Sequence, residues 1–339
     1  MHDALQPAFA ELLDGRPLPA ELMKAAVDAI MDGECSEAEV AAFLTALRLR
    51  GESVGELVGA ALAMRERSTT IHCQAEGLLD TCGTGGDQLS TFNISTAAAL
   101  VAAAAGQPVA KHGNRGATSK SGSADVLEAL GVNLQLSAEQ VGRCIDEVGI
   151  GFCFAPLLHS AMKHVGPVRK QLGFRTIFNL LGPLTNPARA SYQLLGATKN
   201  NFAEKLAQSL FKLGTQRALV VCGNNELDEV SLWGSTMVFE VTPTEVISHL
   251  WTAETLGLPE CHVEALRVDN AAESADVIRR VFAGERGPAY DMVVANAGAA
   301  LLAAGKTVSI QAAVILAKDV VDSGAARDLC ERLTQWTNR

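Results

Sequence analysis

Residues 78–130, LLDTCGTGGDQLSTFNISTAAALVAAAAGQPVAKHGNRGATSKSGSADVLEAL, decide the fold of this chain. The pattern is typical of a short strand, a glycine loop and a helix, followed by a second strand, a second glycine loop and a second helix. The first loop, GTGGD (83–87), leads to a helix that opens at residues 93–96, and the second loop spans residues 111–125. Glycine lets the backbone approach a ligand closely, and the free N–H groups at a helix start favour anions. The two loops therefore predict a site for a highly phosphorylated small molecule.

Composition narrows the class of protein. The chain has 339 residues, of which 48% are hydrophobic and 19% charged, so it is long enough for a sizeable core and is globular. A net charge of −10 argues against coating a nucleic acid or a membrane surface. An acidic chain that holds phosphates must gather its basic residues locally.

The eight cysteines never form a Cys-x-x-Cys pair and are scattered among apolar segments. This pattern favours reduced core thiols in the cytoplasm over disulfides or a zinc site. Cys82 lies beside the first glycine loop, where a packed small residue is favoured over a catalytic thiol. We expect no signal peptide, since Asp3 precedes no apolar run, and no membrane span, since residues 97–105 are far short of about 20.

The N-terminal part, residues 1–67, is expected to be helical throughout. Ser36 with Glu39 and Ser53 with Glu56 have the spacing of capping boxes, which start two of its helices. Apolar residues at helical spacing predict a core face there. Because this part lies outside the α/β pattern, its surplus apolar faces also suggest a homodimer contact.

Strands and helices alternate from about residue 78, which is the signature of an α/β domain. Residues 157–188 interrupt the alternation and are expected to pack on the N-terminal helices. The predicted fold is thus α/β, with a small all-helical domain (1–67, joined in space by about 157–188) and a larger catalytic domain (68–339) with a mostly parallel central sheet. Further strands are expected at 109–110, 150–155, 192–197 and 218–222, and helices at 123–131, 202–213, 271–282, 309–323 and 325–335.

Polar residues of the first loop allow two interpretations each. Asp87 would repel a bare phosphate, so it suits a sugar or amine proton, or an indirect contact with magnesium. Ser95 and Thr96 could only cap the alanine-rich helix, or could also touch ligand or metal. A glycine loop alone would be an ordinary turn.

The second loop and a later acid pair add charge. Lys111, His112, Asn114 and Arg115 follow one another closely, and such a run is usually a solvated basic turn. In an acidic chain with a second anion-friendly loop, we favour a binding role. The pair Asp228-Glu229 is a weak signal alone, since adjacent acids usually face water, although such pairs also hold magnesium.

His159 and Arg169 lie in the irregular segment, ten residues apart. Arg169 could be a helix-surface charge or could grip a carboxylate with two parallel hydrogen bonds. His159 could be a packed ring or part of a site. The residues alone favour neither interpretation.

Five ordered motifs closely resemble the anthranilate phosphoribosyltransferase family, and the likeness covers nearly the whole chain, including the N-terminal helices. They are DTCGTGGD (80–87), TFNIST (91–96), the stretch 111–130, RTIFNLLGPLTNP (175–187) and LDE (227–229). The resemblance implies a nucleoside phosphorylase/phosphoribosyltransferase-like fold and transfer of phosphoribosyl from 5-phosphoribosyl 1-diphosphate to anthranilate in tryptophan synthesis. It also implies magnesium as cofactor and, usually, a homodimer.

Residue roles follow from the resemblance, position by position. The diphosphate sugar should be held by Gly83, Gly86, Asp87, Thr91, Asn93, Ser95, Thr96, Lys111 and Ser123. Magnesium should be served by Ser95, Asp228 and Glu229. The anthranilate path should be lined by Gly83, His112, Asn114, His159 and Arg169, with Arg169 facing the carboxylate. No residue is assigned as general acid or base.

This chain departs from the family pattern at two places, and two rival functions remain. Gly116-Ala117-Thr118 stands where the family has a more serine-rich loop, which predicts a loop that is mobile without ligand; Ser160 stands where proline is common. One rival is a pyrimidine nucleoside phosphorylase-like enzyme, which shares the architecture and the glycine loop. The other is a non-catalytic paralogue that binds sugar phosphate or nucleic acid; the acid pair and the net charge count against it.

Overall fold

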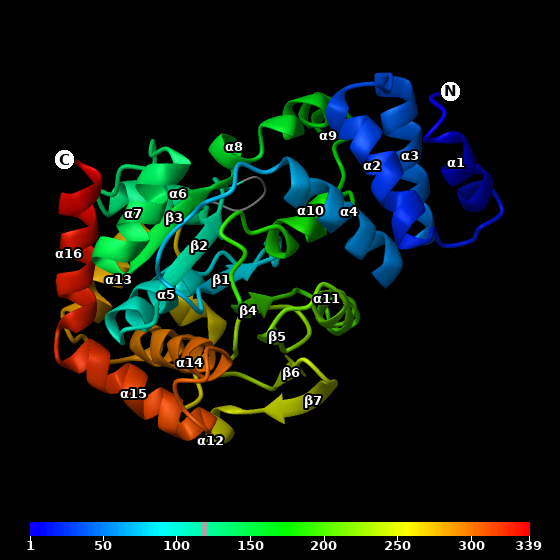
Figure 1. The fold of residues 1–339 in the computed structure, drawn as a ribbon. Coiled ribbons are helices and arrows are strands. Elements are labelled where there is room, and N and C mark those ends of the chain that lie inside the picture. Colours follow the sequence, from blue (N-terminus) through cyan, green and yellow to red (C-terminus); the bar gives the residue numbers. More distant parts are fainter. Residues whose placement is uncertain (117–120) are drawn as a thin grey trace.

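The computed structural model describes residues 1–116 and 121–339, and the expectation about Ala117 and Thr118 therefore lies outside the described residues. A small helical part joins a larger α/β part, as the sequence predicted (Figure 1). The N-terminal helices are α1 (Gln6–Leu13), α2 (Ala20–Asp32), α3 (Glu37–Arg50) and α4 (Val54–Arg67). The strands are β1 (Leu79–Gly83), β2 (Val109–Gly113), β3 (Ile150–Phe154), β4 (Tyr192–Gly196), β5 (Arg217–Gly223), β6 (Thr236–Val241) and β7 (Val246–Trp251).

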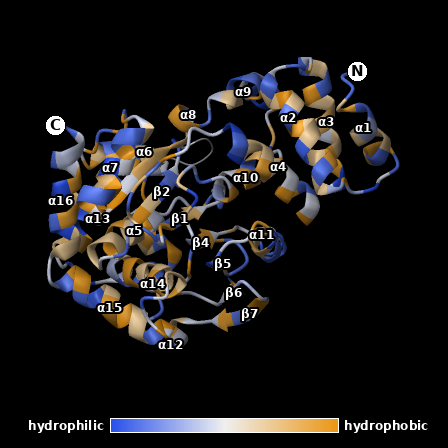
Figure 2. Cartoon of the chain, viewed as in Figure 1, coloured by the Kyte–Doolittle hydropathy of each residue, from blue (hydrophilic) through white to orange (hydrophobic). Residues whose placement is uncertain are grey.

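The remaining helices surround the sheet or connect the two parts. They are α5 (Ile94–Ala104), α6 (Ser123–Ala129), α7 (Ala138–Val148), α8 (Ala155–Leu158), α9 (Gly166–Leu172), α10 (Phe178–Leu181), α11 (Asn200–Lys212), α12 (Ala253–Leu256), α13 (Ala271–Phe282), α14 (Pro288–Ala303), α15 (Ile310–Asp322) and α16 (Ala325–Thr337), with short 3-10 turns η1 (Ser160–His164), η2 (Gly182–Leu184) and η3 (Val263–Leu266). On the outside of the larger part, α15 and α16 carry both polar and apolar segments (Figure 2).

Both predicted capping boxes are present in the helical part. The Ser36 side chain accepts from the backbone N–H of Glu39, and the Glu39 carboxylate accepts from the N–H of Ser36; Ser53 and Glu56 do the same at α4. Each box satisfies backbone donors that the helix itself leaves free, so these two helix starts are fixed by local sequence. At α6, by contrast, Ser123 is the first helical residue, and Gly122 occupies the capping position.

The central sheet has the strand order β3-β2-β1-β4-β5-β6-β7. Neighbouring strands from β3 to β5 are parallel, and β5-β6 and β6-β7 are antiparallel, so the sheet is mostly parallel. Alternate residues of β5 point to opposite faces: Leu219 and Val221 pack in the core with α5 and α14, and Val220 packs in the core with α11 and the N-terminal helices. The sheet is therefore buried on both faces.

The segment after β3 leaves the sheet and packs on the N-terminal helices. One apolar core contains residues of α1–α4 together with Val165, Val168, Ile177 and Leu181. Figure 1 shows α9 beside α2 and α3, and α10 beside α4. The helical part is thus built from two separate stretches of chain.

Several elements between β5 and α15 were not anticipated from the sequence, including the short helix α12. The hairpin β6-β7 extends the sheet, and α14 lies in the middle of the larger core. Within the irregular segment, residues 157–165 form the end of α8 and the 3-10 turn η1.

Candidate active site

The strand order reverses between β1 and β4, and this point locates the site. From β1 the chain moves outward to β2 and β3, and then returns to add β4 on the other side of β1. In open α/β sheets, ligands bind outside the carboxyl ends of the strands at such a reversal. The paired last residues of these two strands are Gly83 and Gly196. The first glycine loop starts at this position.

Asp228 crosses the ends of β1 and β4, and two glycines make room for it. A Cβ atom on Gly196 would lie 1.6 Å from the Asp228 carbonyl oxygen, and one on Gly83 would lie 2.3 Å from Asp228 Oδ2. The same Oδ2 atom accepts a hydrogen bond from the N–H of Gly85 at 2.7 Å. Because Gly83 and Gly196 have no side chain, the Asp228 carboxylate can lie directly against the first loop.

Glu229 extends the acid pair to the start of α5. Its Oε1 atom accepts from the backbone N–H of Ser95 at 2.9 Å, in the first turn of that helix. Burial and the neighbouring charge of Asp228 raise the pKa of Glu229 to about 8, and burial and Asp228 raise the pKa of Asp87 to about 7. Burial also raises the pKa of Asp228. Three carboxyl groups therefore share a site that is short of positive charge.

The first and second loops are held together at the start of α5. Asn93 Nδ2 donates to the Ser121 hydroxyl at 3.2 Å, and Thr96 donates to Asn93 Oδ1 at 3.2 Å. Ser123 Oγ lies 3.4 Å from the carbonyl of Asn114, to which it donates. Of the residues expected around the diphosphate sugar, Asn93 and Thr96 thus bond to each other and Asn93 to the second loop, while Ser123 bonds within the second loop.

Lys111 lies inside a strand rather than after it. We expected the strand to end at residue 110, but β2 continues to Gly113 through its pairing with β3. Lys111 is buried, and its Nζ donates to the Thr81 carbonyl at 2.5 Å. Burial lowers the pKa of Lys111 and raises that of Asp80, whose Oδ2 atom is buried and has no hydrogen-bond partner within the described residues. In this structure the ammonium binds the backbone of β1.

A cavity of ≈ 420 Å³ lies between the second loop and the irregular segment. Four of the five residues expected along the anthranilate path line it, whereas Gly83 does not. Its wall also includes Met64 of α4, which closes it from the helical part. The four residues are His112, Asn114, His159 and Arg169.

Arg169 faces this cavity without a carboxylate partner among the described residues. Its guanidinium lies 5.6 Å from the centre of the Phe178 ring, and Nη2 donates weakly to Asn179 Oδ1 at 3.4 Å. Burial lowers the pKa of Arg169. A partly buried guanidinium with unused donors is suited to a ligand carboxylate.

The hydrogen bonds of His112 and His159 fix the tautomer of both rings. His112 Nδ1 lies 3.0 Å from the Gly182 carbonyl, which can only accept, so Nδ1 carries the proton. His112 Nε2 is then an acceptor, and His159 Nε2, 3.2 Å away, must donate to it. His159 Nδ1 is left as a buried acceptor that finds no partner in the part of the chain that the structure describes. Burial lowers the pKa of His112 to about 4 and that of His159 to about 3, so both rings are neutral at pH 7.

Arg175 is a site residue that the sequence analysis quoted only as part of a motif. Its Nη1 donates to the Gly85 carbonyl at 3.0 Å and its Nη2 to the Thr84 carbonyl at 3.2 Å. A Cβ atom on Gly86 would lie 2.3 Å from Nη1. Arg175 therefore shapes the first loop from outside the two glycine loops, and no local pattern around it signals this contact.

Cys82 has the environment of a packed residue. Burial raises the pKa of its thiol well above the ordinary value, and Gln193 Nε2 donates to its sulfur at 3.3 Å. A protonated, buried thiol is a poor nucleophile.

The acid groups fit a hard cation only in part. Within residues 1–116 and 121–339, no three His, Cys, Asp or Glu side chains come together as ligands of one metal ion. Magnesium commonly uses one or two carboxylates and completes its shell with water and substrate phosphates. The buried acid pair, whose charges no cation balances fully, matches that donor set.

Two family models match the chain. One, described as "Glycosyl transferase family, a/b domain", matches residues 75–327, and the other, "Glycosyl transferase family, helical bundle domain", matches residues 6–68. The first covers well over half of the chain.

Curated relatives are similar over nearly the full length. The anthranilate phosphoribosyltransferase of Symbiobacterium thermophilum is 50% identical over 335 residues, which are 99% of this chain and 98% of the relative. That of Acetivibrio thermocellus is 47% identical over 334 residues, 98% of this chain and 97% of the relative.

Solved structures agree with these relatives. The anthranilate phosphoribosyltransferase of Thermus thermophilus superposes with a TM-score of 0.93 at 44% identity, covering 100% of both chains. The enzyme of that name from Saccharomyces cerevisiae, solved in complex with PRPP and Mg, gives a TM-score of 0.90 at 26% identity and covers 99% of both chains. With the switch-point loops, the acid pair and the arginine-bearing cavity in place, this chain belongs to the anthranilate phosphoribosyltransferase family.

Proposed function

We propose that this chain transfers the phosphoribosyl group of 5-phosphoribosyl 1-diphosphate to the amine of anthranilate, releasing diphosphate, in tryptophan biosynthesis. One observation carries the proposal: His112 and Asn114 line one cavity together with His159 and Arg169, which come from a separate segment later in the chain. The yeast relative has been solved with PRPP and Mg, and also with 4-fluoroanthranilate.

The diphosphate sugar is assigned to the frame formed by the two loops. One supporting contact is the hydrogen bond from Asn93 to Ser121. The others are the hydrogen bonds that the acid pair accepts from the N–H groups of Gly85 and Ser95. A phosphate that reaches these N–H groups must take the place of a carboxylate oxygen, so ligand entry requires the acid pair to turn toward a cation. The residues assigned to this ligand are Gly83, Gly86, Asp87, Thr91, Asn93, Ser95, Thr96, Lys111 and Ser123.

Magnesium is assigned to Asp228, Glu229 and the Ser95 hydroxyl. When bound, the ion would neutralise charge that develops on the departing diphosphate. The raised pKa of Glu229 reflects a site with too many acids for its own cations, and this supports the assignment.

Anthranilate is assigned to the arginine-bearing cavity. Arg169 would hold its carboxylate, and the neutral rings of His112 and His159 would contact the aromatic ring without adding charge. Held in this way, the amine can approach the anomeric carbon from the side of Asn114. The amine is itself a competent nucleophile, so positioning supplies the main catalytic effect and no covalent intermediate is needed.

Charge explains how the residues lower the barrier. Loss of diphosphate leaves positive charge on the ribose and negative charge on the leaving group. The N-terminal dipole of α5 would favour the negative charge on the leaving group, and Lys111, whose Nζ donates to the Thr81 carbonyl, adds a fixed positive charge nearby.

Homodimer formation through the N-terminal helices and a cytoplasmic location complete the proposal. Leu13 and Leu49, in the helical part, are each 83% exposed, which supports a contact there. All eight cysteines are free, as expected in a reducing compartment. None of the helices within the described residues combines the length and apolar character that a membrane span requires.

The test uses the intrinsic fluorescence of anthranilate. The fluorescence intensity should fall as anthranilate is consumed, and this fall should require the protein, 5-phosphoribosyl 1-diphosphate and magnesium together. A parallel reaction with phosphate and a pyrimidine nucleoside should give no free base. Turnover in the second reaction alone would favour the phosphorylase, and DNA binding without turnover in either would favour the paralogue.

A further inference from the structure

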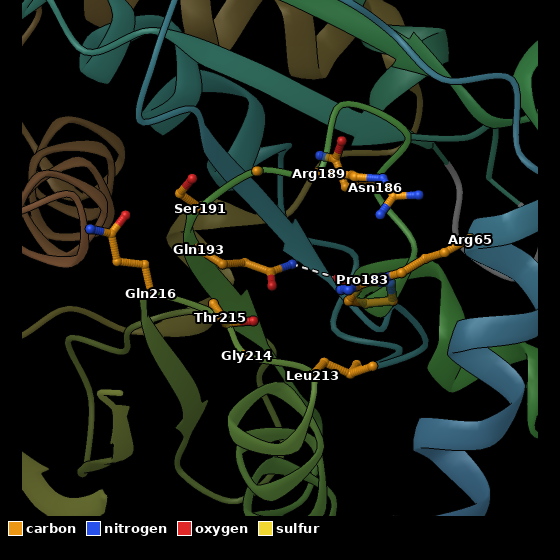
Figure 3. A pocket seen from close by; sticks show the side chains of 11 residues that line it. Arg65, Pro183, Asn186, Arg189, Ser191, Gln193, Leu213, Gly214, Thr215 and Gln216 are labelled. Atoms are coloured by element: carbon orange, nitrogen blue, oxygen red, sulfur yellow. Dashed lines mark hydrogen bonds between the residues drawn. The ribbon is translucent and has the colours of Figure 1, made fainter. Parts of the chain in front are cut away.

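A second cavity lies behind the anthranilate cavity, at the opposite end of the sheet from the glycine loops. It has a volume of ≈ 370 Å³ and is lined by the end of α4, the segment 183–193 and the turn between α11 and β5 (Figure 3). β4 begins at its edge and carries the chain about 13 Å to the switch point. The cavity is therefore separate from the proposed substrate site.

Two arginines line this cavity, and no Asp or Glu is among its lining residues. Arg65 reaches in from α4, and its Nε donates to the Leu184 carbonyl at 2.7 Å (Figure 3). Arg189 follows the turn after Asn186, and within the described residues its guanidinium makes no hydrogen bond or ion pair. Burial and the charge of Arg189 lower the pKa of Arg65 to about 10, so no carboxylate offsets the burial of its charge.

The other polar groups of the cavity divide into used and unused donors. The Asn186 amide donates to the Ala110 carbonyl at 2.8 Å, and the Gln193 amide donates to the Pro183 carbonyl at 2.6 Å. The hydroxyl groups of Ser191 and Thr215 line the cavity, and no partner is recorded for them within the described residues. The open side-chain donors within the described residues are thus two guanidinium groups, two hydroxyls and the Gln216 amide.

We propose that this cavity binds a phosphate-type dianion, either free phosphate or the phosphate group of a small ester, between Arg65 and Arg189. Two guanidinium groups offer planar pairs of donors that match the oxygens of a tetrahedral oxyanion, and two positive charges match a dianion. Binding removes the repulsion between the two arginines. The backbone of Arg189 has φ of 51°, in the left-handed region, so the turn holds this side chain in an unusual position beside the cavity.

The site shares a wall with the anthranilate cavity. Met64 and Thr185 line the anthranilate cavity, whereas their sequence neighbours Arg65 and Asn186 line the second cavity. An anion here would therefore bind against the far side of the α4 and η2 wall, without touching the proposed substrates.

The variants for a test are Arg65→Gln, Arg189→Asn and, as a matched control, Arg332→Gln. Asparagine tolerates the left-handed backbone at position 189. Arg332 is exposed on α16, so its replacement removes the same charge away from the cavity. If Arg65→Gln does not fold because the bond to Leu184 is lost, Arg189→Asn still tests the site.

The first measurement is calorimetric titration of inorganic phosphate at constant ionic strength, with ribose 5-phosphate in a second arm to distinguish free from esterified phosphate. The wild type and Arg332→Gln should show one binding event that both cavity variants weaken at least tenfold. Equal phosphate binding by all four proteins would overturn the proposal. The second measurement locates the anion: crystals soaked in selenate should give an anomalous peak between Arg65 and Arg189, and peaks confined to the glycine loops would overturn it.

Discussion

The carboxylate of Glu229 accepts a hydrogen bond from the backbone N–H of Ser95 at 2.9 Å, although 134 residues separate them. The Asp228 carboxylate likewise accepts from the N–H of Gly85. The two contacts join the loop after β5 to the first glycine loop and to the start of α5. Two of the N–H groups that we assign to the phosphate, those of Gly85 and Ser95, thus bond to the protein's own acids when no ligand is bound.

Replacing Asp228 and Glu229 together with Ala should abolish turnover and leave the fold intact, because the proposed cation site loses both carboxylates. Turnover is followed by anthranilate fluorescence, and folding by circular dichroism. Glu264→Ala, at a side chain that is 68% exposed, is the control and should keep full activity. Wild-type activity in the double variant would refute the metal assignment.

Gly196→Ala should remove most of the activity, since its Cβ would lie 1.6 Å from the Asp228 carbonyl oxygen. Overpacking of this kind typically costs about 1–3 kcal/mol of stability. Gly55→Ala is the control, because its Cβ would meet nothing closer than 3.5 Å. Thermal unfolding and activity of both variants decide the matter; an active, stable Gly196→Ala enzyme would show that Asp228 need not cross the strand ends.

Arg169→Ala should raise the KM for anthranilate roughly ten- to hundredfold, the effect of losing a charge-assisted hydrogen bond of about 1.5–3 kcal/mol. The KM for the diphosphate sugar should barely change. Arg169→Lys should recover only part of the loss, because an ammonium lacks the planar fork. Loss of affinity for the sugar instead would place Arg169 at the phosphate site.

Lys111→Met should destabilise the protein, because it leaves the buried carboxyl of Asp80 without its nearby cation and removes the bond to the Thr81 carbonyl. Adding Asp80→Asn should recover much of this loss. Urea denaturation of the two single variants and the double variant measures the coupling. Additive effects would show that Asp80 and Lys111 do not stabilise each other. The KM for the diphosphate sugar, measured where the double variant folds, isolates any contact of Lys111 with phosphate.

His159 should make the stability of the wild type depend on pH in a defined direction. The ring binds a proton below about pH 6.5 in the unfolded chain, but only near 3 in the folded one. As pH falls through this window, the free energy of unfolding should decrease by about 1.4 kcal/mol per pH unit relative to a His159→Gln variant. Urea denaturation of both proteins from pH 7 to pH 5 tests this, and parallel curves would mean that the ring is protonated in the fold.

Features that depend on local sequence could be predicted, and features that depend on distant packing could not. The capping boxes at Ser36 and Ser53 need only residues three apart. The helix α14 was missed because it is buried on nearly every side and so shows no polar face, and the hairpin β6-β7 because it alternates weakly at the edge of the sheet.

The same distinction applies to the site. The two glycine loops can be predicted from their local composition. The extension of β2 through Lys111 cannot, because it depends on pairing with β3. Arg175 contacts the first loop from 90 residues away, a relation that no spacing in the chain encodes. The resemblance to a family supplied the roles of Arg169 and His159; the cavity that brings them together appears only in three dimensions.

The helical part closes its core with side chains such as Val165, Phe178 and Leu181, about a hundred residues after its own four helices end. During synthesis at roughly 5–20 residues per second, those helices leave the ribosome long before their partners exist. Their apolar faces therefore stay without these partners for several seconds, while three strands of the sheet are synthesised. A fragment ending at Arg67 would keep those faces exposed, so the nascent chain, rather than the finished enzyme, is where this fold is most open to aggregation and to chaperones.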